Sequence, residues 1–225
     1  MNLKKFIKTR EKEKTHFTWK GVQVFLKDPI LNPEVSLTQV LETIGKKIPS
    51  HLLRNLDTIY IGDFDFFRER EIQAMYENSS IFVTNNQKNE EDMCDDIIHE
   101  IAHSVEDMHK DLIYSDGALE SEFKTKREKL YLVLKGEGVP ANLSDFSDCA
   151  YREEFDEYLY KEVGYPLLNM VSSNIFYSPY AITSLREYFA NGFEAYFYYG
   201  DYDFVKKTCP QLFNKLNALL EIGYD

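Results

Sequence analysis

The chain has 225 residues, of which 44% are hydrophobic and 28% charged, a composition typical of one folded domain or a small pair of domains. Aromatic residues make up 15% of the chain, which excludes an intrinsically disordered protein. The formal net charge of −12 argues against nucleic acid and anionic membrane as partners, because phosphate groups bind to clustered lysine and arginine.

Residues 1–20 are rich in charge, and we expect them to form an N-terminal arm. They lack the apolar stretch of a secretory signal peptide, and the chain has no apolar run of about 18 residues that would predict a membrane span. The three cysteines, Cys94, Cys149 and Cys209, form no CxxC pair, so neither a disulfide framework nor a cysteine zinc site is expected. These features predict a protein of the cytoplasm or one delivered by a non-classical route.

The periodicity of apolar residues predicts strands first and helices after them. Alternating or β-branched segments predict strands at 21–28, 57–63 and 79–86. Helical spacing predicts helices at 36–48, 66–77, 90–112, 118–135, 151–163 and 184–201, with one or two more from residue 204 onward. Ser36, Asn89 and Ser184 stand at N-cap positions of three of these helices. This order predicts an α+β fold in two layers.

The expected domain organisation is an arm followed by one domain. That domain spans residues 21–225, with a strand-rich part at 21–88 and a helical part at 89–225. The breaker residues of Gly136–Pro140 predict a loop that runs to about residue 150, and this loop is the favoured boundary between lobes. Residues 169–183 are polar and aromatic without a clear period, and we expect them to be irregular.

The segment His99-Glu100-Ile101-Ala102-His103 is an HExxH motif inside a predicted helix. The helix places both imidazoles on one face, one turn apart, where neutral ring nitrogens can bind Zn²⁺. Glu100 is then placed to take the proton of a zinc-bound water. Apolar neighbours on this helix predict that it is buried, and buried polar groups need partners or a metal.

Two residues compete to be the third ligand. His109 stands where the metzincin pattern HExxHxxGxxH has its last histidine, but Glu106 replaces the glycine of that pattern. The helix is therefore expected to continue, which turns His109 by about 240° away from His103. The other candidate is Glu187 in the first turn of a later helix, three residues after Ser184, in a capping-box pattern.

Two stretches resemble one known family. HEIAHSVED is similar to its H-E-x-G-H-x-x-D-D stretch, residues 187–193 are similar to its E-F-F-A-E-A-F stretch, and Tyr180 lies seven residues before Glu187, where the family has a tyrosine. The chain, over roughly residues 57–225, resembles the catalytic domain of anthrax lethal factor and the clostridial Pro-Pro endopeptidases, which are gluzincin-type zinc metalloproteases.

The resemblance implies a zincin-like fold, with a small mixed sheet packed on the HExxH helix and a mostly helical C-terminal lobe. It implies His99, His103 and Glu187 as zinc ligands, Glu100 as general base, and Tyr180 as the phenol that stabilises the oxyanion. A site of two histidines and one glutamate with an open position is the thermolysin-type arrangement, and a phenol aimed at the oxyanion suits amide hydrolysis.

The chain departs from the family in two places. Asn191 replaces a second acidic residue, and it can hydrogen-bond a ligand histidine but cannot supply the charge. Glu194, one turn further, is a candidate to compensate. The connection from His103 to Tyr180 is longer than in the family, which predicts an inserted helical piece at about 115–160.

The sequence therefore predicts a zinc-dependent endopeptidase whose partner is a protein or peptide substrate. We expect the strand at 79–86 to be an edge strand that binds the substrate as an added strand. Two alternatives remain: a catalytically weak or inactive zincin-like binding or assembly protein of a virion or toxin, and a metzincin-like protease that uses His109.

Overall fold

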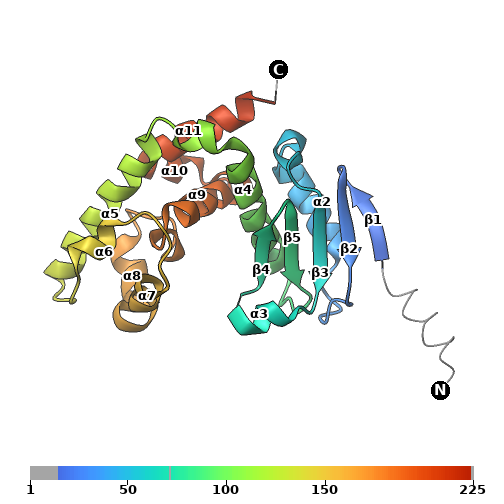
Figure 1. The fold of residues 1–225 in the computed structure, drawn as a ribbon, viewed down its shortest axis with the longest axis horizontal. Coiled ribbons are helices and arrows are strands. Elements are labelled where there is room, and N and C mark those ends of the chain that lie inside the picture. The colour runs from blue at the N-terminus through green and yellow to red at the C-terminus, as the bar shows by residue number, and fades with distance from the viewer. Residues whose placement is uncertain (1–14, 71, 224–225) are drawn as a thin grey trace. The chain divides into compact units, whose positions relative to one another are not determined.

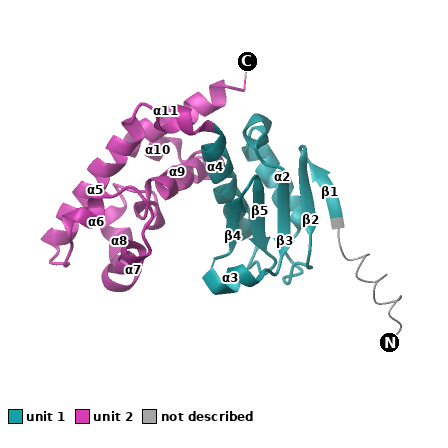
Figure 2. Ribbon diagram, viewed as in Figure 1, with its two compact units in different colours: residues 1–108 teal, residues 109–225 magenta. Residues whose placement is uncertain are grey.

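A computed structural model of the protein describes residues 15–70 and 72–223, which divide into two compact units (Figures 1 and 2). The first unit ends at Met108 and the second begins at His109. The lobe boundary expected at Gly136–Pro140 is therefore wrong. The physical reason is that Arg127 donates hydrogen bonds to the backbone carbonyls of Asp145 and Asp148, which ties the chain beyond the loop to the helix before it.

The first unit contains a five-stranded mixed sheet in the order β1-β2-β3-β5-β4. The strands are β1 (Thr15–Trp19), β2 (Val22–Leu26), β3 (Thr58–Gly62), β4 (Ala74–Glu77) and β5 (Ser80–Thr84). β2, β3 and β5 run parallel, and β1 and β4 pair antiparallel at the two sides. Of the expected arm at residues 1–20, residues 1–14 lie outside the described residues. Most of the remainder is strand β1.

Two predictions about β4 and β5 are wrong. The helix expected at 66–77 ends early: α3 (Asp65–Arg70) is followed by β4. Asn78 and Ser79 have positive φ angles of 49° and 59°, and this two-residue turn folds β4 back on β5. The expected edge strand at 79–86 is therefore an interior strand between β3 and β4, and β4 lies at the outside of the described sheet.

Two long helices of the first unit lie along one face of this sheet (Figure 1). They are α2 (Leu37–Lys47) and α4 (Glu90–Tyr114), with a 3₁₀ turn at Ser50–Leu53 after α2. The buried core joins the sheet residues Val24, Ile59, Ile61, Ile81 and Val83 to helix residues Val40, Ile44, Ile97 and Ile101, all fully buried. On the other face, Phe25, Tyr60 and Phe82 stack in register with ring centroids 5.1–5.3 Å apart.

The described residues of the second unit form helices and the loops between them, with no strand among them. It contains the end of α4, then α5 (Ala118–Gly136), α6 (Leu143–Ser147), α7 (Glu153–Glu157), a π-helix (Tyr158–Val163), α8 (Tyr165–Ser172), a 3₁₀ turn (Tyr180–Ile182), α9 (Leu185–Phe193), a π-helix (Glu194–Tyr199), α10 (Tyr202–Thr208) and α11 (Pro210–Glu221). The segment expected to be helical at about 115–160 is helical over most of its length. The first four residues of the segment expected to be irregular, 169–183, belong to helix α8. This helix begins after Gly164, which has a positive φ, and it has Pro166 in its first turn.

The predicted α+β class is confirmed, because a mixed sheet and many helices make up the described chain. The strands at β2, β3 and β5 and the helices α2, α4, α5 and α9 fall where the sequence predicts them. Among the described residues, no helix combines the length and the apolar character that crossing a membrane requires.

Candidate metal centre

Helix α4 carries the two histidines of the HExxH motif. Asn89 begins it, because its Oδ1 accepts a hydrogen bond from the backbone N–H of Asp92 at 2.7 Å. The apolar side of the helix is fully buried, so the turn with His99 and His103 is held against the core of the first unit. Their ring centroids are 4.9 Å apart, which is the proximity that the i, i+4 spacing predicts.

Glu100 lies in the same turn of α4 and is 8% exposed. Its neighbour one turn earlier, Asp96, is half-buried, and Gln87 donates a hydrogen bond to its carboxylate at 2.9 Å. The pKa of Asp96 is raised from 3.8 to about 6, chiefly by burial and also by the negative charges of Asp95 and Glu100, while the hydrogen bond from Gln87 lowers it. The helix therefore holds one buried carboxyl group, that of Glu100, and one half-buried carboxyl group, that of Asp96, within about one turn.

Glu187 lies in the first turn of α9. Ser184 is the N-cap, and its Oγ accepts a hydrogen bond from the Glu187 backbone N–H at 3.1 Å, as one half of a capping box requires. Glu187 is 9% exposed and the rest of α9 up to Phe193 is buried. A carboxylate in the first helical turn interacts favourably with the helix dipole.

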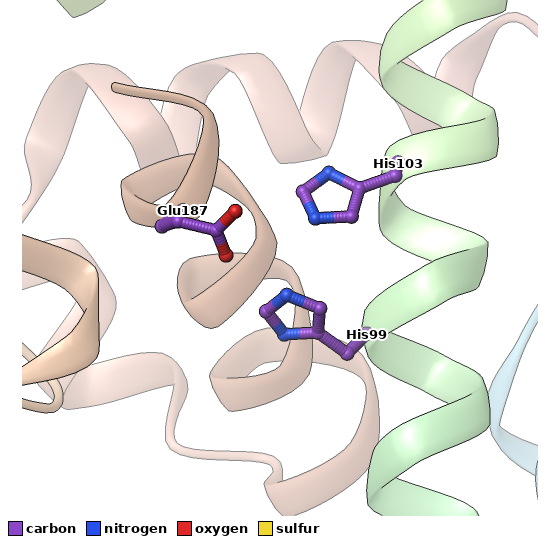
Figure 3. Close-up of side chains that lie close together, drawn as sticks. All are labelled: His99, His103 and Glu187. Carbon is purple, nitrogen blue, oxygen red and sulfur yellow. The ribbon is translucent and has the colours of Figure 1, made fainter. Parts of the chain in front are cut away.

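The ligand atoms of His99, His103 and Glu187 all lie within 4.8 Å of one another (Figure 3). This buried group could hold a metal ion. Ligand atoms about 2.0–2.2 Å from one zinc ion in a tetrahedron are about 3.5 Å apart, which is of the same order as the spacing within this group. Two imidazoles and one carboxylate also form a donor set that zinc accepts.

His109 does not belong to this group. The helix continues through Glu106 and Asp107, as predicted, and ends at Tyr114. His109 itself interrupts the helical geometry, with φ −116° and ψ 21°, at the residue where the second unit begins. Of the two candidates for the third ligand, the structure brings Glu187 to the two histidines.

Tyr180 begins a 3₁₀ turn four residues before Ser184. Its side chain is 39% exposed. Two hydroxyl groups hold the turn: Ser178 Oγ accepts from the Ala181 backbone N–H at 3.2 Å, and Thr183 Oγ1 donates to the Tyr180 carbonyl at 2.8 Å. The phenol is thus carried by a backbone that local hydrogen bonds define.

Asn191 is 5% exposed and is used within its own unit. Its Nδ2 donates to the Glu187 carbonyl at 3.0 Å, and its Oδ1 accepts from the Ser178 hydroxyl. Its amide therefore connects α9 to the turn of Tyr180, and not to a ligand histidine as the sequence suggested. Glu194, the other residue considered for that role, is 6% exposed at the start of the π-helix that follows α9.

One residue that contacts a candidate ligand was assigned no role from the sequence. Glu106 Oε2 lies 3.2 Å from His103 Nδ1, and the two side chains are only 13% and 7% exposed. In the sequence Glu106 was noted as the replacement for the metzincin glycine and as part of the HEIAHSVED stretch, but it was given no role at the site. Its i, i+3 spacing from His103 on a helix was the signal that could have identified it.

The chain was also compared with known proteins. No family model, no curated protein and no solved structure matches it.

Proposed function

We propose that the protein is a zinc-dependent endopeptidase with His99, His103 and Glu187 as its metal ligands. The observation that carries this proposal is the group of three ligand atoms within 4.8 Å of one another. The buried residue Glu100 directly follows the ligand His99 on α4. The order of the motifs also supports membership of the lethal factor-like gluzincins, which remains part of the proposal.

The donor set supports zinc in particular. Three protein ligands leave one position of a tetrahedral ion open, which is characteristic of catalytic rather than structural zinc sites. When bound, zinc would act as a Lewis acid and make water more acidic. The residues of the chain would then carry out the proton transfers and the positioning of the substrate.

Glu100 is the general base in this proposal. Its carboxylate takes a proton from the attacking water and delivers it to the nitrogen of the departing amine, so that one group serves both halves of amide hydrolysis. Tyr180 donates a hydrogen bond from its phenol to the oxyanion that develops on the scissile carbonyl. A substrate peptide adds to β4, because that strand lies at the outside of the described sheet in the unit that holds α4.

The test compares the wild-type protein with Glu100→Gln. Each is loaded with zinc, the bound zinc is measured, and cleavage of a peptide library is followed by mass spectrometry. We expect one zinc per chain in both proteins and a loss of cleavage of about 10²–10⁴-fold in Glu100→Gln, the usual contribution of a general base.

The matched control is Glu91→Gln, the same change at an exposed position in the first turn of α4. It should retain both zinc and cleavage. Cleavage that is the same in Glu100→Gln as in wild type would contradict the proposal.

A further inference from the structure

A carboxylate contacts the ring of His103 on the side of its Nδ1 atom. Glu106 Oε2 and His103 Nδ1 are 3.2 Å apart, and both side chains are nearly buried, at 13% and 7% exposure. The two residues are three positions apart on α4, so the continuous helix brings them to the same face. A contact of this kind between buried groups is much stronger than the same contact in water.

The contact determines which ring nitrogen carries the proton. An ionised carboxylate can only accept hydrogen bonds, so the hydrogen of a neutral His103 must be on Nδ1. The lone pair is then on Nε2, and a metal ion binds to the nitrogen that has the lone pair. A carboxylate partner also makes the imidazole a better electron donor.

The turn that carries Glu106 is itself held in place. Tyr76 of β4 donates a hydrogen bond to Asp107 at 3.4 Å, and Asn55 donates to the Ser104 carbonyl at 3.3 Å and to the Tyr76 hydroxyl at 2.9 Å. These contacts join the turn of Glu106 to the sheet of its own unit. Glu106 therefore presents its carboxylate from a fixed backbone.

We propose that Glu106 is a positioning residue, which holds His103 in the tautomer with the proton on Nδ1 and directs Nε2 toward the metal. It supplies the negative charge that Asn191, occupied by Ser178 and the Glu187 carbonyl, does not supply. This inference rests on the proposed function, because it requires His103 to be a metal ligand.

The experiment measures the zinc dissociation constant of the full chain at pH 7 by competition with a chelating dye. Glu106→Gln keeps the size and an acceptor oxygen but removes the charge, and Glu91→Gln is the matched control on the same helix. We expect zinc to bind about 10–100-fold more weakly to Glu106→Gln, the usual effect of losing such a partner, and unchanged in Glu91→Gln.

A second readout separates positioning from a merely structural role. The ¹⁵N shifts of the His103 imidazole in the metal-free protein report its tautomer. The wild type should show the proton on Nδ1, and Glu106→Gln should show a mixture of tautomers at an unchanged unfolding temperature.

Two results would overturn the inference, and they are distinguishable. If His103→Ala loses zinc while Glu106→Gln has wild-type affinity and tautomer, the role of Glu106 is wrong and the proposed function stands. If zinc binding is the same in wild type and His103→Ala, the metal site itself is wrong, and both proposals fall.

Discussion

Ser184 and Glu187 are joined by a hydrogen bond of 3.1 Å from the backbone N–H of Glu187 to the Ser184 hydroxyl. This bond begins α9, and the same residue that donates it is the one whose carboxylate lies with His99 and His103. The N-cap therefore has two roles: it satisfies a backbone donor, and it fixes the backbone from which the candidate ligand extends.

Replacing Ser184 by alanine should destabilise the protein by about 1 kcal/mol, because a buried N-cap bond is lost. Ser184→Asp, which retains an acceptor at the cap, should destabilise it less. Urea unfolding of the metal-free variants measures both free energies. Equal stability of Ser184→Ala and wild type would show that the cap does not hold this turn.

Tyr180→Phe should reduce cleavage and retain zinc, because it removes the phenol hydroxyl but no ligand. The loss of one oxyanion donor typically lowers kcat by about 10²–10³-fold. Ser178→Ala should also lower kcat, but by a smaller factor. It removes the hydroxyl that hydrogen-bonds Asn191 and the Ala181 backbone N–H, so the turn of Tyr180 is held less firmly.

The measurement for both variants is kcat on one cleaved peptide. A fall in zinc content, or a Tyr180→Phe enzyme as fast as wild type, would remove Tyr180 from the mechanism.

Asp96 predicts a dependence of stability on pH. Burial raises its pKa in the folded protein from 3.8 to about 6. Between pH 4 and pH 6 the folded state keeps a proton that the unfolded chain has lost, so stability should fall as the pH rises through this window. Asp96→Asn removes the ionisable group, and it should be more stable than wild type at pH 7 by up to about 3 kcal/mol.

Urea unfolding of metal-free wild type and Asp96→Asn at pH 4 and pH 7 measures this effect. The difference between the two proteins should be larger at pH 7. A variant that is less stable than wild type at pH 7 would contradict the prediction.

Gly192 lies where helix α9 packs closely against Leu212 of helix α11. A Cβ at this position would lie 2.1 Å from Cδ2 of Leu212, which is itself 1% exposed. Gly192→Ala should therefore destabilise the protein by about 1–3 kcal/mol through overpacking. Gly136→Ala is the control, because a Cβ there meets no atom within 4 Å and alanine favours the end of α5.

The thermal midpoint of both glycine variants is the measurement. We expect it to fall in Gly192→Ala and to stay or rise slightly in Gly136→Ala. Equal midpoints would mean that Leu212 moves aside without loss of packing.

The elements that sequence periodicity identified are those with a strong local signal. The parallel strands β2, β3 and β5 are alternating or β-branched, and α4 and α9 have caps and an apolar side in the sequence itself. β4 was missed because its four residues follow a short helix and have no alternation long enough to detect. Its place at the outside of the sheet depends on the turn at Asn78 and Ser79, a conformation that these residue types permit but do not require.

At the site, spacing alone placed His99, Glu100 and His103 on one helix, and the N-cap pattern placed Glu187 in the first turn of another. That these residues come together is a tertiary fact that periodicity cannot supply. The partner of Asn191 was likewise not predictable, because it comes from a loop thirteen residues away, whereas the i, i+3 spacing of Glu106 from His103 was a local signal that was not used. Ser178 and His103 are the residues that the fold places next to Asn191 and Glu106.

The central claim is that His99, His103 and Glu187 bind one zinc ion. Anomalous diffraction at the zinc edge from crystals of the zinc-loaded protein tests it most directly. We predict one strong peak about 2.0–2.2 Å from a nitrogen of each histidine and a carboxylate oxygen of Glu187. A peak that includes His109 in place of Glu187, or no peak at these residues, would contradict the claim.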